Sequence, residues 1–182
     1  MNVLITGASG GLGRAFSIEC ARRGYNLFLT DIGEEKLSTI RKGVLRQYPD
    51  IQVEIGACDL TDTGSVDVLL EAFNKKSIAF DMLLNVAGVD YEGGFMERDA
   101  SQIEKIIRLN IEATLRITHL VLERRPGNDS FFIVFVSSLA SLYPMPLKAT
   151  YAASKRFLLD FSIALGEELE AQKVSVLSLC PA

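Results

Sequence analysis

The stretch Val3-Leu4-Ile5-Thr6-Gly7-Ala8-Ser9-Gly10-Gly11-Leu12-Gly13 decides the fold of this chain. An apolar run typical of a buried strand passes directly into a turn rich in glycine, which allows sharp backbone angles and leaves room for a phosphate. A helix beginning near Gly11 would direct free N–H groups and the positive end of its dipole at that phosphate. That helix is expected because an amphipathic pattern follows, at Leu12, Phe16, Ile18 and Ala21. The stretch therefore predicts a phosphate-binding turn, with an ordinary tight turn as the alternative.

The composition is that of a single folded domain. The chain has 182 residues, of which 48% are apolar, so a sizeable core can form over residues 1–182. Its formal net charge is −4 and it has no long basic run, which argues against nucleic acid as its main partner. No apolar stretch reaches the length that spans a membrane, and the start shows no signal-peptide pattern. We therefore expect a cytoplasmic protein without a membrane partner.

The cysteines and the histidine do not form a metal or catalytic constellation. Cys20, Cys58 and Cys180 are widely separated and odd in number, which favours buried or half-buried thiols in a reducing compartment. His119 is the one histidine of the chain, and no metal-ligand spacing surrounds it. We expect no metal site, and we interpret His119 as a structural or surface residue of a helix.

Strand and helix patterns alternate along the chain, without repeats or low-complexity segments. Short runs rich in Val, Ile, Leu and Phe predict strands at 2–6, 25–30, 51–57, 81–86, 131–137 and 174–179. Helices are predicted at 11–23, 34–47, 63–76, 99–124 and 151–171. Turn residues separate these elements at Gly24, 49–50, 93–94 and 126–129. The alternation predicts an α/β fold of the Rossmann type, a doubly wound parallel sheet with strand order 3-2-1-4-5-6.

Asp31 ends the second predicted strand, at the edge where such sheets bind their ligands. A carboxylate here can accept hydrogen bonds from the adenosine ribose, and it would repel the 2′-phosphate of NADP. Ile32 comes next, so the following position offers no compensating cation. The pattern favours NAD as the cofactor. The alternative is an exposed loop residue, or the N-cap of the next helix.

Tyr151 and Lys155 lie four residues apart on a predicted helix and therefore share a face. An unperturbed tyrosine has a pKa of about 10, and a nearby ammonium favours the phenolate form. Tyr151 could then give a proton to a carbonyl or take one from an alcohol, while Ser138 holds the substrate oxygen. Taken alone, a Tyr-x-x-x-Lys pair is usually a helix surface pair. Its position after Ser138, which ends a strand run, favours the catalytic interpretation.

Asn110 falls inside the predicted helix 99–124, where asparagine is a mediocre helix former. Its amide could organise a water by exposing or bonding a backbone carbonyl. That water would extend a proton relay from Lys155 to solvent. The alternative is a polar residue that the helix tolerates.

Taken together, these motifs resemble the short-chain dehydrogenase/reductase family in its Tyr-x-x-x-Lys, short-subunit form. Thr6-Gly7-x-x-x-Gly11-x-Gly13 is similar to the cofactor motif of that family, and Asn85-Val86-Ala87-Gly88 to its Asn-Asn-Ala-Gly motif. The resemblance covers the chain from end to end and implies two sets of site residues. The catalytic tetrad would be Asn110, Ser138, Tyr151 and Lys155. The cofactor-binding residues would be Gly7, Ser9, Gly11, Leu12, Gly13, Asp31, Ile32, Asp59 (which resembles the adenine-contacting aspartate), Leu60, Asn85, Ala87, Gly88, Tyr151 and Lys155.

The chain departs from the family pattern in three respects. Val86 replaces the second asparagine of the Asn-Asn-Ala-Gly motif, and Pro181-Ala182 stands where family members usually have Pro-Gly. Family members also continue with a substrate-covering loop, helices and a seventh strand, which we expect to be absent from this form. In the resulting open cleft, water would screen the interaction of Tyr151 with Lys155. Cofactor binding would survive this loss better than turnover.

The expected function is an NAD(P)-dependent oxidoreductase, with NAD preferred, that transfers hydride between the nicotinamide and a secondary alcohol or ketone. Apolar residues near the predicted site, such as Phe95 and Leu142, favour an apolar or medium-sized carbonyl substrate. The alternative is a non-catalytic nucleotide-binding or interaction module on the same fold. Apolar residues of the helices 99–124 and 151–171 exceed one face, and the family commonly dimerises through these helices, so a homodimer or homotetramer is expected.

Overall fold

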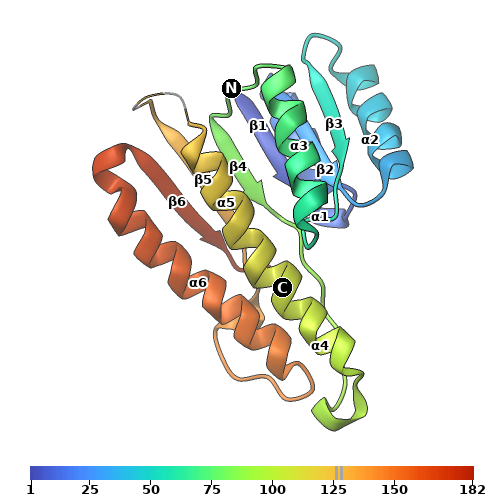
Figure 1. The fold of residues 1–182 in the computed structure, drawn as a ribbon, viewed down its shortest axis with the longest axis vertical. Helices are drawn as coiled ribbons and strands as arrows, with labels where there is room; N and C mark the ends of the chain where they lie inside the picture. Colours follow the sequence, from blue (N-terminus) through green and yellow to red (C-terminus); the bar gives the residue numbers. More distant parts are fainter. Residues whose placement is uncertain (126, 128) are drawn as a thin grey trace.

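The computed structural model describes residues 1–125, 127 and 129–182, and it contains one parallel sheet of six strands (Figure 1). The strands lie in the order β3-β2-β1-β4-β5-β6, which confirms the predicted order. The predicted turn residues Pro126 and Asn128 lie outside the described residues. The strands are β1 (Asn2–Thr6), β2 (Asn26–Asp31), β3 (Val53–Ala57), β4 (Met82–Asn85), β5 (Phe131–Val136) and β6 (Val174–Leu179).

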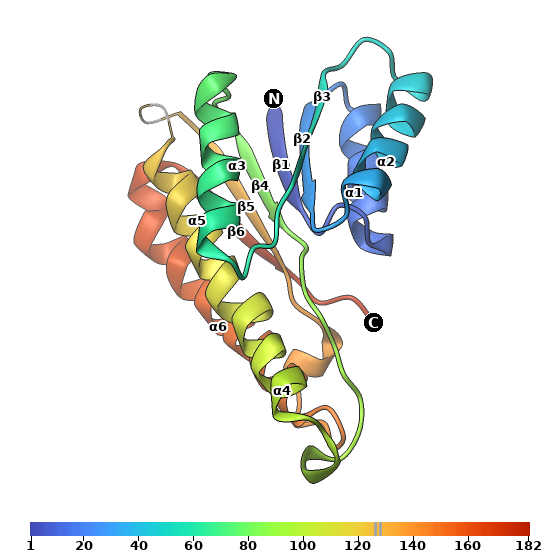
Figure 2. The same cartoon turned by 45° about the vertical axis from the view of Figure 1, so that its right-hand side comes forward.

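Helices cover both faces of the sheet (Figure 2). One face carries α1 (Gly11–Arg22) and α2 (Glu34–Gln47), and the other carries α3 (Thr63–Lys75), α5 (Thr114–Glu123) and α6 (Ala149–Leu169). Val3, Leu4 and Ile5 of the central strand β1 are completely buried, because both of their sides face a helical layer. The continuous apolar runs of the sequence are therefore strands with two covered faces.

The predicted helix 99–124 is helical from Ala100 to Glu123, but its middle turns are π-helical rather than α-helical. It consists of α4 (Ala100–Ile107), a π-helical segment η2 (Arg108–Ala113) and α5, and Asn110 lies in the π-helical segment. A π-helical turn holds one residue more than an α-helical turn, and such segments occur mostly where a functional contact distorts a helix. The distortion here coincides with the contacts of the Asn110 side chain, which come from a loop distant in the sequence. A sequence pattern confined to the helix could not have located it.

The predicted apolar face of α1 is wrong in part. The helix is buried through Gly13, Ser17, Cys20 and Ala21, whereas Leu12 and Ile18 are 44% and 45% exposed. The physical reason is the close approach of α1 to β1, which only small side chains allow. The larger apolar side chains line two hollows instead: Leu12 lines a groove beside the glycine turn, and Ile18 lines a hollow between α1 and α2.

A threonine joins the loops that follow β1 and β4. The Thr6 hydroxyl oxygen accepts hydrogen bonds from the backbone N–H groups of Val86 (3.0 Å) and Ala87 (3.2 Å). Because β1 and β4 are neighbours and parallel, both loops leave the sheet at the same edge. This edge holds the glycine turn, Asp31 at the end of β2 and the residues that follow β5.

Candidate active site

The glycine turn is built by two close backbone approaches. Gly7 has a φ of +62°, and a Cβ at this position would lie 2.6 Å from the Cα of Ala87. At Gly13 a Cβ would lie 2.2 Å from the carbonyl oxygen of Gly7. Gly10, the N-cap of α1, provides no side-chain cap, so the first N–H groups of the helix stay available. At Gly11 a Cβ would meet nothing within 4 Å. The turn therefore presents open backbone and a free helix N-terminus, which suit a pyrophosphate.

Two acids, Asp31 and Asp59, line the same groove as the glycine turn. One carboxylate oxygen of Asp31 accepts from the backbone N–H of Ser9 (3.0 Å), and the other accepts from that of Ile32 (2.8 Å). The N-cap of α2 is Gly33. The alternative interpretation of Asp31 as the N-cap of this helix is therefore wrong. Asp59 accepts from the hydroxyl and the backbone N–H of Thr61, and these two hydrogen bonds lower the pKa of its carboxyl group. Both carboxylates are thus held in fixed orientations by hydrogen bonds.

One groove of about 500 Å³ collects most of the predicted cofactor-binding residues. Three predicted cofactor-binding residues do not line this groove: Asn85, and the tetrad residues Tyr151 and Lys155. The Asn85 side chain is buried instead, donating to the hydroxyl of Thr118 (2.9 Å) and so fixing the end of β4 against α5. The groove is lined by Gly7, Ser9, Gly11, Leu12, Gly13, Asp31, Ile32, Asp59, Leu60, Ala87 and Gly88, together with Lys105 and Leu109, which the sequence did not single out.

Asn110 holds the loop after β4 by both of its amide atoms. Its Oδ1 accepts from the N–H of Val89 (2.8 Å), and its Nδ2 donates to the carbonyl of Val89 (3.0 Å) and to the hydroxyl of Ser154 (3.1 Å). Ser154 in turn donates to the carbonyl of Tyr151 (2.7 Å). The side chain is completely buried and its donors and acceptor are engaged. Asn110 therefore connects the nucleotide loop to the first turn of α6, where Tyr151 lies.

Ser138, Tyr151 and Lys155 line one cavity of about 230 Å³ beyond the end of β5. The Ser138 hydroxyl oxygen caps the short helix η3 (Leu139–Ser141) by accepting from the N–H of Ala140 (3.2 Å). The ammonium nitrogen of Lys155 lies 5.7 Å from the centre of the Tyr151 ring. Gly88 and Leu12 line both this cavity and the nucleotide groove, so the two sites adjoin.

Both the side-chain ammonium and the backbone carbonyl of Lys155 form hydrogen bonds with residues at the end of β5 or directly after it. Its Nζ donates to the carbonyl of Val136 (2.8 Å), and its own carbonyl accepts from the hydroxyl of Ser137 (2.7 Å). The residue is 4% exposed. Burial lowers the pKa of its ammonium group to about 8, and the charge of Asp90 opposes this effect. A Cβ on Gly88 would lie 3.2 Å from this Nζ, so the glycine leaves the space that the ammonium occupies.

The model of the short chain dehydrogenase family matches residues 1–182. The chain belongs to the short-chain dehydrogenase family. Among curated members, it is 33% identical over 175 residues to the very-long-chain 3-oxoacyl-CoA reductase of Ajellomyces capsulatus, covering 95% of this chain and 52% of that protein. It is also 33% identical over 184 residues to the very-long-chain 3-oxoacyl-CoA reductase let-767 of Caenorhabditis briggsae, covering 98% and 58%. The chain thus spans about half the length of the curated relatives it matches.

Solved structures of the short-chain dehydrogenase family match the whole chain. The short-chain dehydrogenase from Sphingobium yanoikuyae in complex with NADPH is 30% identical, with a TM-score of 0.91, covering 100% of this chain and 70% of that one. The bulky-bulky ketone specific alcohol dehydrogenase from Comamonas testosteroni is 26% identical, with the same TM-score and 72% of that chain covered. The family and the fold expected from the sequence are therefore confirmed.

The sequence patterns did not point to two charged residues near the cavity that holds Tyr151 and Lys155. Asp90 lines the cavity with Tyr151 and Lys155, and Lys148 forms an ion pair with Asp90. The Nζ of Lys148 also lies 5.7 Å from the centre of the Tyr151 ring. Lys148 is the N-cap residue of α6, three residues before Tyr151, and this short spacing was the available signal.

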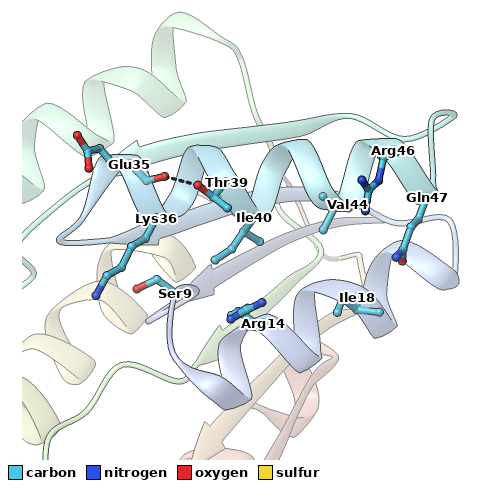
Figure 3. A pocket seen from close by; sticks show the side chains of 11 residues that line it. Ser9, Arg14, Ile18, Glu35, Lys36, Thr39, Ile40, Val44, Arg46 and Gln47 are labelled. Atoms are coloured by element: carbon cyan, nitrogen blue, oxygen red, sulfur yellow. Dashed lines mark hydrogen bonds between the residues drawn. The ribbon is translucent and has the colours of Figure 1, made fainter.

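A larger hollow, of about 720 Å³, lies between α1 and α2 on the outer side of the glycine turn (Figure 3). Ser9 lines both this hollow and the nucleotide groove. In Figure 3 the side chain of Ser9 lies between those of Arg14 and Lys36. Two exposed cations therefore lie close to the part of the dehydrogenase groove that Asp31 marks, although neither is adjacent to Asp31 in the sequence.

The remaining expectations concern the cysteines, the histidine, and the absence of a metal site and of a membrane span. Cys20 and Cys58 are buried, Cys180 is half-buried, and all three are free thiols. The His119 side chain is 73% exposed and lies 3.6 Å from the Glu123 carboxylate on α5. Within residues 1–125, 127 and 129–182, no group of His, Cys, Asp or Glu is arranged to hold a metal ion. None of the described helices is long and apolar enough to cross a membrane.

Proposed function

We propose that this chain carries the nucleotide-binding and catalytic residues of an NAD(P)-dependent oxidoreductase acting on a secondary alcohol or its ketone. The observation that carries the proposal is the shared cavity of Ser138, Tyr151 and Lys155, which adjoins the nucleotide groove through Leu12 and Gly88. The bound nicotinamide would supply or accept the hydride. The residues of the cavity would supply the proton and the orientation of the substrate.

Tyr151 is the proposed proton donor and acceptor. During reduction its hydroxyl would protonate the oxygen of the substrate while the carbonyl carbon receives the hydride, and oxidation would reverse both transfers. Ser138 would hold the same oxygen through its hydroxyl. Lys155 stabilises the phenolate by its charge, and in the low-dielectric interior this interaction is stronger than in water. Asn110 positions these groups through Val89 and Ser154.

The preference for NAD over NADP is part of the proposal. Its support is Asp31, whose carboxylate lies in the groove and is held by the N–H groups of Ser9 and Ile32. This carboxylate would accept hydrogen bonds from the ribose hydroxyls and repel a 2′-phosphate. Arg14 and Lys36 act in the opposite direction, because they would attract a phosphate beside Ser9. The carboxylate is the nearer charge, since it contacts the Ser9 backbone directly.

We propose a 3-oxoacyl thioester as the class of substrate. The curated relatives are named for reactions on very-long-chain 3-oxoacyl-CoA, and the 30% identical dehydrogenase was solved with NADPH. Apolar side chains are exposed on the two loops beside the catalytic cavity, which would suit an acyl chain. They are Phe95, Met96, Leu139, Leu142, Tyr143 and Leu147.

The test is a reduction assay on the purified chain, with acetoacetyl-CoA and a longer 3-oxoacyl-CoA as substrates and NADH or NADPH as the reductant. Substrate-dependent loss of reduced nicotinamide would support the proposal. Binding of NADH without turnover of any thioester or ketone would instead favour a non-catalytic nucleotide-binding module. A parallel fluorescence titration with NADH separates these outcomes, because it measures binding without turnover.

We also propose a cytoplasmic homodimer or homotetramer. Phe157 and Ile163 of α6 are 39% and 58% exposed, and Phe157 stacks on Phe161 at a centroid distance of 5.9 Å. An apolar helix face of this kind is typical of subunit interfaces. Light scattering coupled to size-exclusion chromatography measures the mass in solution, and a monomer at micromolar concentration would contradict the proposal.

A further inference from the structure

Lys148 stands between two acids and the proposed proton donor. Its Nζ is paired with the carboxylate of Asp90 and lies 3.5 Å from that of Glu92. The same nitrogen is 5.7 Å from the centre of the Tyr151 ring, the distance at which Lys155 also lies. The phenol therefore has two ammonium groups beside its ring, one buried and one in the loop region that opens to solvent.

The pairing joins two segments that come from different parts of the sheet edge. Gly93 donates its N–H to the carbonyl of Leu147 (2.8 Å), one residue before Lys148. The Asn110 side chain forms hydrogen bonds with both the backbone N–H and the carbonyl of Val89, one residue before Asp90. Asp90 is consequently held next to a fixed residue, and Lys148 is held as the N-cap residue of α6. The ion pair between them has little freedom to move away from Tyr151.

The charged groups that face Tyr151 come from three elements. Lys155 belongs to α6 and Lys148 is its N-cap residue, whereas Asp90 and Glu92 belong to the segment after β4. Arg98, which precedes α4, lines a small cavity of about 100 Å³ together with Tyr151. Asp90 is the acid that acts on both ammonium groups, because it pairs with Lys148 and its charge also acts on Lys155.

We infer that Lys148 and Asp90 are a pair of positioning residues that set the electrostatic environment of Tyr151 with opposite signs. The inference deepens the proposed function, because it assumes that Tyr151 exchanges the proton. The Lys148 ammonium favours the phenolate and the Asp90 carboxylate opposes it. A unit charge about 6 Å away, at an effective dielectric constant of about 40, corresponds to roughly one pH unit in the ionisation of the phenol.

Substitution of the two partners separates an electrostatic role from a purely structural one, because only an electrostatic role shifts the Tyr151 midpoint in opposite directions. Lys148→Met leaves Asp90 uncompensated, so the ionisation midpoint of Tyr151 rises by about half to one pH unit. Asp90→Asn removes the one carboxylate that acts on both ammonium groups, while Glu92 still lies 3.5 Å from Lys148, so the midpoint falls. Loosening of the loop alone would move both variants in the same direction. Lys148→Arg keeps the charge and restores the wild-type midpoint.

The midpoint is measured by NMR on protein labelled with ¹³Cζ-tyrosine. The chain has five tyrosines, so the spectrum is simple enough to assign. The Tyr151 signal is the one lost in Tyr151→Phe. Arg156→Gln serves as the matched control, because it removes a cation from an exposed pair with Asp160 on the same helix. Shifts of opposite sign in the two variants, with none in the control, support the inference. Shifts of one sign, or no shift, overturn it.

This measurement needs no turnover, so it is independent of the proposed activity. Opposite shifts in a protein that reduces no carbonyl compound would leave the electrostatic pair established and refute the proposed function. In an active protein, the pH profile of alcohol oxidation follows the same order, with Lys148→Met displaced to higher pH and Asp90→Asn to lower pH. A profile displaced in one direction by both variants contradicts the inference.

Discussion

Gly13 packs so closely on Gly7 that a Cβ on Gly13 would lie 2.2 Å from the Gly7 carbonyl oxygen and 2.7 Å from the Cα of Ala8. Both obstacles are backbone atoms, which cannot rotate away. We expect Gly13→Ala to destabilise the protein by about 3 kcal/mol and to abolish dinucleotide binding. Gly11→Ala is the matched control, because a Cβ there meets nothing within 4 Å and should change stability by less than about 0.5 kcal/mol. Urea unfolding measures both, and equal losses of stability would contradict the geometry.

The proposed proton transfer predicts that Tyr151→Phe lowers the turnover number by about 10²- to 10⁴-fold, the range typical of general acid–base groups. The affinity for NADH should change by no more than about twofold, since the substitution removes only the hydroxyl. The measurements are steady-state kinetics and an NADH fluorescence titration. Tyr143→Phe, at a side chain that is 55% exposed beside the cavity, is the control and should retain activity. Turnover unchanged in Tyr151→Phe would exclude it as the proton donor.

The position of Asp31 predicts the cofactor preference. Wild-type protein should bind NADH more tightly than NADPH, and Asp31→Ala should shift the ratio of the two dissociation constants towards NADPH by at least about tenfold, or 1.4 kcal/mol. The gain follows because the repelling carboxylate is removed while Arg14 and Lys36 remain beside Ser9. Adding Arg14→Gln to Asp31→Ala should reverse part of the shift. Fluorescence titration measures these affinities, and a ratio that Asp31→Ala leaves unchanged would be evidence against the assignment.

Burial of the Lys155 ammonium predicts a pH dependence of stability. Its pKa falls from 10.5 to about 8, so between these values the unfolded chain holds a proton that the folded protein has released. The free energy of unfolding should therefore rise with pH across this window, by about 3 kcal/mol in total from this group. Lys155→Met removes the titration, and the difference in slope between the two proteins should be about one proton. Parallel slopes from pH 8 to pH 10.5, measured by urea unfolding without nucleotide, would contradict this prediction.

The helix boundaries show how far the sequence pattern reaches. The ends of α2 and of β1 and β6 agree with the predicted ranges, because their apolar periodicity is strong and turn residues flank them. The helix predicted at 99–124 is present from Ala100 to Glu123, but the pattern did not predict the π-helical segment at Asn110, whose side chain is bonded to Val89. A local pattern contains no information about a partner 21 residues away. The apolar face of α1 failed for a related reason, since its burial is set by Gly7 and Ala8 rather than by hydrophobicity.

The sequence by itself determined the order of the elements, the strand order of the sheet, the family and the edge at which the predicted site residues lie. These follow from local patterns and from the rule that parallel strands bring their carboxyl ends to one edge. Only the tertiary structure decided which charges meet there. Arg14 and Lys36, from two different helices, line the same hollow as Ser9, and Asp90 pairs with Lys148 across the sheet edge. Such contacts depend on distances in space, which the spacing of residues along one chain does not fix.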